Sequence, residues 1–150
     1  TISIDQKNRF SIPAKYRADF LETNESEVIV TKDPQYPALM IYPGKSWKEI
    51  SRKFEALGGL NQKVRHIQWK VLGNASVTEF EVTERMTLLI PQILREFANL
   101  VLKAQVALIG MGSKFELWNL ENWEKKQSGL EVPGEDLIEN LPSSLEEIPF

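Results

Sequence analysis

The stretch that decides the fold is Asp5-Gln6-Lys7-Asn8-Arg9-Phe10-Ser11-Ile12-Pro13-Ala14-Lys15-Tyr16-Arg17. Its Lys7-Asn8 pair predicts a tight turn between two short β-prone runs, because Asn accepts a positive φ more readily than most residues. Pro13 then ends the second strand and begins a helix, since its fixed φ suits the first helical turn, where its missing N–H is not needed. The stretch therefore predicts a strand–turn–strand–helix unit.

Four cationic side chains fall within this unit, two at the turn and two on the helix: Lys7, Arg9, Lys15 and Arg17. Cations gathered in this way are typical of a phosphate-binding surface. An ordinary solvated surface explains the same residues, so this stretch alone leaves both interpretations open.

The composition is that of a globular protein of one domain or two small ones, with 150 residues, 42% hydrophobic and 26% charged. The sequence contains no cysteine, which excludes disulfides and thiolate metal sites. Apolar runs such as 28–30 and 106–109 are too short to span a bilayer, and no signal peptide is recognised. We therefore expect a cytoplasmic protein.

Charge is distributed unevenly along the chain. Residues 129–150, called the acidic segment below, carry six acidic side chains and no Lys or Arg, a net charge of −6. The remaining 18 basic and 15 acidic side chains give residues 1–128 a net charge of +3. A mildly basic body is compatible with a nucleic-acid partner.

The sequence contains an internal repeat. Four elements recur in the same order, 76 to 78 residues later: an Ile-Pro-x-x-x-Arg motif (12–17 and 90–95), a buried strand (28–30 and 106–108), a second strand (39–42 and 115–118) and an early helical tryptophan (Trp47 and Trp123). Each copy is too small to bury its own apolar face, so we expect the two copies to pack on each other as a pseudo-dimer. Arg17 and Arg95 persist in both copies, which favours a role in the fold.

One helix is expected at the end of the first copy, and a second helix bridges the two copies. Ser46 is a predicted N-cap, with Glu49 as its capping-box partner. A bridging helix follows at about residues 61–72, and its basic cluster of Lys63, Arg65 and Lys70 is either a second nucleic-acid surface or a solvated face.

With the repeat established, the sequence resembles the MraZ family of bacterial proteins, which are built from two AbrB-like swapped-hairpin halves. The family's Asp-x-x-x-Arg element is present at residues 5–9, followed by Ser11-Ile12-Pro13, and the similarity extends over about residues 1–127. The resemblance implies an α+β fold in which two tandem AbrB-like swapped-hairpin halves form an intrachain pseudo-dimer β-barrel with short flanking helices. The expected division is a first half at 1–59, a bridging helix at 60–74, a second half at 75–128 and an acidic, flexible tail at 129–150.

The implied function is that of a sequence-specific DNA-binding transcriptional regulator acting on promoter direct repeats of the division and cell-wall gene cluster. The implied partners are double-stranded DNA and further copies of the chain in a ring-shaped homo-oligomer, associated with the nucleoid. No cofactor, metal, membrane or small-molecule substrate is implied. Lys7 and Arg9 are the expected DNA contacts, Asn8 and Lys15 are further candidates, and Asp5 shapes the turn.

The second copy departs from the family pattern. Counting back from Pro91, Thr83 stands where the Asp is expected and Thr87 where the Arg is expected. Arg85 lies two positions before Thr87, so strand alternation predicts the same side, and it is a further DNA-binding candidate. This degeneracy leaves an alternative, an oligomeric scaffold or interaction protein with weakened or lost DNA binding.

No catalytic site is predicted. The single histidine, His66, has no partner placed beside it by the sequence, and no P-loop, His-Glu-x-x-His or Gly-x-Ser-x-Gly motif is present. The acidic segment suggests a different role, as a competitor of DNA that lies across the basic hairpin. Truncation after Gln127 is then expected to tighten DNA binding at low salt.

Overall fold

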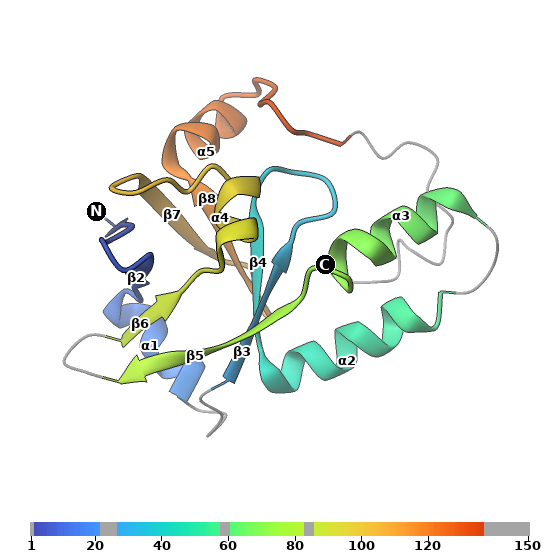
Figure 1. The fold of residues 1–150 in the computed structure, drawn as a ribbon, viewed down its shortest axis with the longest axis horizontal. Helices are drawn as coiled ribbons and strands as arrows, with labels where there is room; N and C mark the ends of the chain where they lie inside the picture. The colour runs from blue at the N-terminus through green and yellow to red at the C-terminus, as the bar shows by residue number, and fades with distance from the viewer. Residues whose placement is uncertain (1, 22–26, 58–60, 83–85, 137–150) are drawn as a thin grey trace.

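The structure is a computed structural model and describes residues 2–21, 27–57, 61–82 and 86–136. Its elements follow in chain order: β1 (Ile2–Ser3), β2 (Arg9–Ser11), α1 (Ala14–Leu21), β3 (Glu27–Lys32), β4 (Leu39–Pro43), α2 (Gly44–Glu55), α3 (Gln62–Val71), β5 (Ser76–Val82), β6 (Met86–Leu89), α4 (Gln92–Phe97), β7 (Gln105–Gly110), β8 (Phe115–Asn119) and α5 (Leu120–Gln127). They make an α+β fold, a curled antiparallel sheet with short helices around it (Figure 1). None of the helices in the described ranges is long and apolar enough to cross a membrane.

The order of the strands shows that the two halves exchange their hairpins. The sheet runs β1-β7-β8-β4-β3-β5-β6-β2. Strands β1 and β2 of the first half pair with β7 and β6 of the second, and β5 of the second half pairs with β3 of the first. The outer strands β1 and β2 meet at the turn of residues 5–9, where the Asp5 N–H donates to the Arg9 carbonyl at 2.8 Å. The predicted fold of two swapped-hairpin halves is confirmed.

The strand register relates the halves by an approximate twofold axis. Phe10 faces Leu88 where β2 pairs with β6, and Met40 faces Glu116 where β4 pairs with β8. The members of these pairs are 78 and 76 residues apart, which are the two offsets of the sequence repeat. In these two pairs each residue faces its own counterpart, as it does at a twofold axis, so the predicted pseudo-dimer is confirmed at the level of the backbone.

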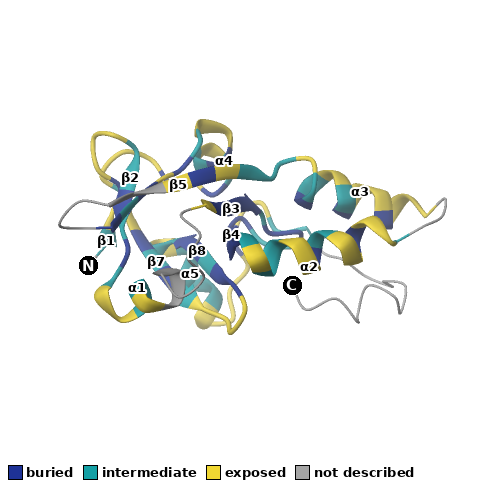
Figure 2. Ribbon diagram, turned by 90° about the horizontal axis from the view of Figure 1, so that it is seen from below, coloured by how far each residue is buried: buried dark blue, intermediate teal, exposed yellow. Residues whose placement is uncertain are grey.

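Apolar side chains are buried on both faces of the sheet. The main cluster lies inside the curl and includes Phe10, Leu88 and Leu117. A second cluster lies outside, where α2 and α3 cover β3 and β4; these helices lie side by side at one end of the molecule, with their outer faces exposed (Figure 2). The repeat extends to an aromatic pair outside the sheet, since Tyr42 packs on Trp47 at 5.5 Å between ring centres, as Trp118 packs on Trp123 at 5.4 Å.

Two local predictions are wrong. The helix α2 begins at Gly44 with Pro43 as its N-cap and no capping side chain, because β4 runs directly into it; Ser46 therefore lies inside the helix. In the second hairpin Glu81 faces Thr87, as Asp5 faces Arg9 in the first, so Glu81 rather than Thr83 occupies the position equivalent to Asp5. The second hairpin is two residues longer than the first, and this difference shifts the count.

Candidate functional site

The turn of residues 5–9, called the 5–9 turn below, is held by one carboxylate. Asp5 Oδ1 accepts hydrogen bonds from the backbone N–H groups of Lys7 at 2.8 Å and Arg9 at 3.0 Å. Asn8 has the predicted positive φ, 63°, and its N–H donates to the Asp5 carbonyl at 3.1 Å. As a result Lys7 is exposed at the tip and Arg9 is half-buried at the start of β2. Both cations are carried by a backbone that is fixed without any ligand.

The second half supports the turn through an arginine. Arg95 Nη1 donates to Asn8 Oδ1 at 2.8 Å, and Arg95 Nε donates to the Ile90 carbonyl at 2.8 Å. The Ile90 N–H in turn donates to the Asn8 carbonyl at 3.1 Å. Asn8 therefore has a structural role in this turn, and its contact with DNA stays a prediction.

A groove beside the turn is lined in part by Arg17, for which the sequence repeat had predicted a structural role. Its lining includes Asp5, Arg9 and Arg17. Arg17 Nε donates to the Ile12 carbonyl at 3.0 Å, which agrees with the expected structural role, but the same side chain also faces this groove. The spacing in the sequence could have indicated that Arg17 faces this groove. Arg17 lies four positions after Pro13, about one helical turn, so its side chain points back toward the strand that precedes the helix. Two guanidinium groups in one groove suit a phosphate or another anion.

The remaining predicted contacts are placed differently. Lys15 is exposed on α1, and its Nζ lies 4.8 Å from the centre of the Tyr16 ring, outside the groove residues. Arg85 lies outside the described residues. The structure thus brings together Asp5, Arg9 and Arg17, with Lys7 at the adjacent tip.

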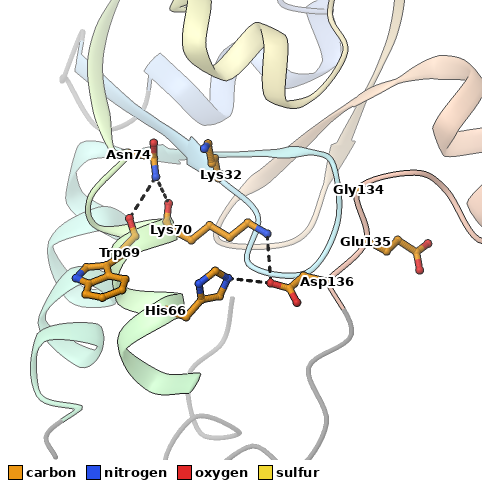
Figure 3. A pocket seen from close by; sticks show the side chains of 8 residues that line it. All are labelled: Lys32, His66, Trp69, Lys70, Asn74, Gly134, Glu135 and Asp136. Atoms are coloured by element: carbon orange, nitrogen blue, oxygen red, sulfur yellow. Dashed lines mark hydrogen bonds and ion pairs between the residues drawn. The ribbon is translucent and has the colours of Figure 1, made fainter. Parts of the chain in front are cut away.

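A second group of charges, which sequence reasoning missed, lies at the other end of the molecule (Figure 3). His66 Nε2 lies 3.0 Å from Asp136 Oδ2, and Lys70 Nζ lies 3.9 Å from the same oxygen. Lys70 also donates to the Pro34 carbonyl at 3.2 Å, and burial lowers its pKa. Lys70 is therefore not a solvated cation, and His66 has a partner 70 residues away for which the sequence held no signal.

The first part of the acidic segment is bound to the body. Val132 is buried against Ala38 and Trp118. Lys126 Nζ contacts Glu135 Oε1 at 2.6 Å; this hydrogen bond raises the pKa of Lys126 and lowers that of Glu135. Gly134 has a φ of 95°, and a Cβ there would lie 3.3 Å from the Pro37 side chain, so a residue with a side chain would be strained. Residues 129–136 thus lack regular structure but hold a defined position.

Buried charged side chains also lie near the twofold axis. Lys114 Nζ lies 3.7 Å from Glu116 Oε2 and 3.4 Å from the Met40 sulfur. Burial lowers the pKa of Lys114 and raises that of Asp33. In the part of the chain that the structure describes, no group of three His, Asp or Glu side chains is arranged to hold a metal ion.

Known proteins resemble this chain over most of its length. The family model described as "MraZ protein, putative antitoxin-like" matches residues 1–69 and 75–138. A relative from Thiobacillus denitrificans is 39% identical over 83% of this chain and 80% of its own length, and one from Coxiella burnetii is 37% identical over 95% and 93%. A relative from Nitrosomonas europaea is 37% identical over 82% and 80%, and all three are named transcriptional regulator MraZ. The chain belongs to the MraZ family.

Proposed function

We propose that this protein is a transcriptional regulator that binds double-stranded DNA in a sequence-specific manner through the 5–9 turn. One observation carries the proposal: Asp5 binds the backbone N–H groups of both Lys7 and Arg9, so the turn presents two cations on a preformed backbone. The names of the related proteins support the regulatory role.

The chemistry of the turn suits a nucleic acid. A lysine ammonium supplies a point charge to a phosphate, whereas an arginine guanidinium can bind a phosphate or a guanine edge with two hydrogen bonds. Arg17 adds a second guanidinium in the groove beside Arg9. In this proposal Lys7 and Arg17 contact the backbone of the DNA, and Arg9 is positioned to read a base. Lys15 and Arg85 remain candidates for further contacts.

One small turn covers few base pairs, so the proposal includes assembly. A ring-shaped homo-oligomer would place several such turns in front of direct repeats in a promoter. Linked sites gain affinity through effective concentration, without any new contact in a single subunit. We propose the promoter of the division and cell-wall gene cluster as the target and the nucleoid as the location.

The test is a salt titration of binding to DNA from upstream of the protein's own gene. The intact chain is compared with Lys7→Ala, Arg9→Ala and the double variant. Each lost phosphate contact is expected to reduce the slope of log affinity against log salt by about one. Arg9→Ala is also expected to reduce the preference for the upstream sequence over a scrambled sequence of the same length.

Lys53→Ala is the matched control, because Lys53 is an exposed lysine on α2, away from the turn. Equal binding by the intact chain and the double variant would contradict the assignment of the turn. Oligomers in light scattering without any binding to DNA would instead favour the scaffold alternative, which the degenerate second hairpin had suggested.

A further inference from the structure

The helices α2 and α3 form a basic surface at the end of the molecule opposite the 5–9 turn (Figures 1 and 2). Four Lys and Arg side chains lie on α2 and three on α3, against two Glu on α2 and no acidic side chain on α3. The proposed function does not use this surface. An excess of like charge on adjacent helices is unfavourable unless counter-charges lie close to it.

The outer face of α3 also carries an exposed aromatic ring. Trp69 is 64% exposed, and Arg65 and His66, one turn before it, are exposed on the same face. Buried Val64, Ile67 and Val71 point the other way, into the cluster under the helix. A large exposed aromatic ring beside cations is typical of a surface that contacts a partner with both apolar and acidic side chains.

The acidic segment contacts this surface through Asp136. The Asp136 N–H donates to the Gln35 carbonyl at 2.7 Å, and the Asp136 carboxylate lies against His66 and Lys70. Figure 3 shows His66 and Lys70 both directed at Asp136, with Trp69 on the side of His66 away from it. Asp136 therefore contacts two residues of α3, His66 and Lys70, that lie within one helical turn of Trp69 in sequence.

The sequence after Asp136 has the complementary chemistry. Residues 137–150 contain three acidic side chains and no Lys or Arg, interleaved with large apolar side chains: Leu137, Ile138, Leu141, Leu145, Ile148 and Phe150. A segment of this kind offers carboxylates to the cations of α2 and α3 and apolar groups to Trp69. Its effective concentration at the surface is high, because Asp136 is already fixed there.

We propose that residues 137–150 dock in cis on the outer face of α3, over Trp69 and the adjacent basic side chains. The docked segment offsets part of the positive charge at this end of the molecule, because its three acidic side chains face a net charge of +5 from seven basic and two acidic side chains on α2 and α3. It also replaces the expectation that the acidic segment lies across the basic hairpin, since residues 130–136 lead toward α3 and away from the turn (Figure 1). This docking does not require the protein to bind DNA.

Acrylamide quenching of Trp69 fluorescence in the full chain tests this docking. The contribution of Trp69 is obtained by subtracting the signal of Trp69→Phe, measured in each background. We expect the quenching constant of Trp69 to rise several-fold when Leu141→Ser and Leu145→Ser are combined, because the apolar contacts of the segment are lost. Arg65→Glu is expected to raise the constant as well, through repulsion of the acidic side chains.

Lys15→Glu makes the same change of charge on α1, at the far end of the molecule, and is expected to leave Trp69 quenching unchanged. Circular dichroism establishes that each variant is folded. Identical quenching in the intact chain and the Leu141→Ser, Leu145→Ser variant would overturn the proposal. Protection of Trp69 that appears only as the protein concentration rises would also overturn it, because the occupant would then come from a second copy.

Discussion

The two halves of this protein repeat one arginine contact but use the rest of the side chain differently. Arg17 Nε donates to the Ile12 carbonyl, and Arg95 Nε donates to the Ile90 carbonyl, five residues before it in both halves. Arg95 then binds Asn8. The residue that matches Asn8 in the second half, 78 residues later, is Met86, which offers no amide oxygen.

Contacts that maintain the fold recur in both halves, whereas side chains that are available for function differ between them. Two backbone hydrogen bonds are repeated between the halves, from Ile12 N–H to the Met86 carbonyl at 2.8 Å and from Ile90 N–H to the Asn8 carbonyl at 3.1 Å. They need no particular side chain, so they survive the divergence of the two turns. Among the described residues Arg17 has no amide partner like Asn8, and it instead faces the groove that also contains Arg9.

The largest effect is expected where the halves share one core. Phe10 and Leu88 face each other at the axis, and neither is exposed. Phe10→Ala and Leu88→Ala are each expected to lower the free energy of unfolding by about 3–4 kcal/mol, because both leave a cavity that the curled sheet cannot close. Urea unfolding followed by circular dichroism measures this.

Leu89→Ala is the control for this prediction, since Leu89 is adjacent in β6 but 39% exposed, and a much smaller loss is expected. If one half tolerated its substitution while the other did not, the halves would not share a single cooperative core, and the comparison would fail at its first step.

Substitution of the two arginines is expected to lower the free energy of unfolding by smaller and unequal amounts. Arg95→Met removes contacts to two oxygens and is expected to cost about 2 kcal/mol, whereas Arg17→Met removes one such contact and is expected to cost about 1 kcal/mol. Unfolding midpoints at constant m-value give the difference. Equal losses would show that the Asn8 contact contributes nothing, and would remove the asymmetry on which the comparison rests.

DNA binding is expected to respond in the opposite order to stability at this pair. Arg17→Met removes a cation from the groove and is expected to lower the salt dependence of binding, while Arg95→Met acts only through the shape of the 5–9 turn. The two measurements together distinguish a structural arginine from one that has both roles.

The elements that sequence predicted well are those specified by repetition. The Ile-Pro-x-x-x-Arg motif fixes a strand end and a helix start in both halves, and the Trp47 and Trp123 positions fix the aromatic pairs. A prediction from local residue preference failed where the neighbouring element determined the start of a helix. Ser46 has the chemistry of an N-cap, but β4 continues into α2 two residues earlier, so that chemistry is not used.

The site was predictable only where it is local in sequence. Asp5, Asn8 and Arg9 lie within one turn, so their spacing already specifies the hydrogen bonds that form. The contact of Asp136 with His66 joins residues 70 positions apart, and it depends on the path of residues 129–136 over the sheet. No pattern in either segment indicates that path.

Lys114, a buried lysine of the second half, has Ala38 as its counterpart in the first half. The Asp33 N–H donates to the Ala38 carbonyl at 3.0 Å, and in the second half the Met111 N–H donates to the Lys114 carbonyl at 2.9 Å. The two loops thus match, yet each half buries one ionisable side chain where the other has an apolar one. Lys114 is 2% exposed, and burial lowers its pKa below the ordinary 10.5.

This difference predicts the sign of a pH effect. Between the lowered pKa of Lys114 and 10.5, the unfolded chain binds a proton at this residue that the folded chain does not, so the contribution of Lys114 to the free energy of unfolding is expected to rise with pH in that range. Burial raises the pKa of Tyr42, so the contribution of Tyr42 is expected to fall with pH as that range approaches its ordinary pKa of 10.0. Lys114→Met is expected to reduce this rise, measured by urea unfolding at a series of alkaline pH values. Part of the rise is expected to remain, because burial also lowers the pKa of Lys70; Lys70→Met is the matched variant. If the free energy of unfolding changed with pH in the same way for the intact chain and Lys114→Met, Lys114 would keep its proton in the folded state, held by Glu116. Burying this lysine in only one of the two loops would then not favour its neutral form.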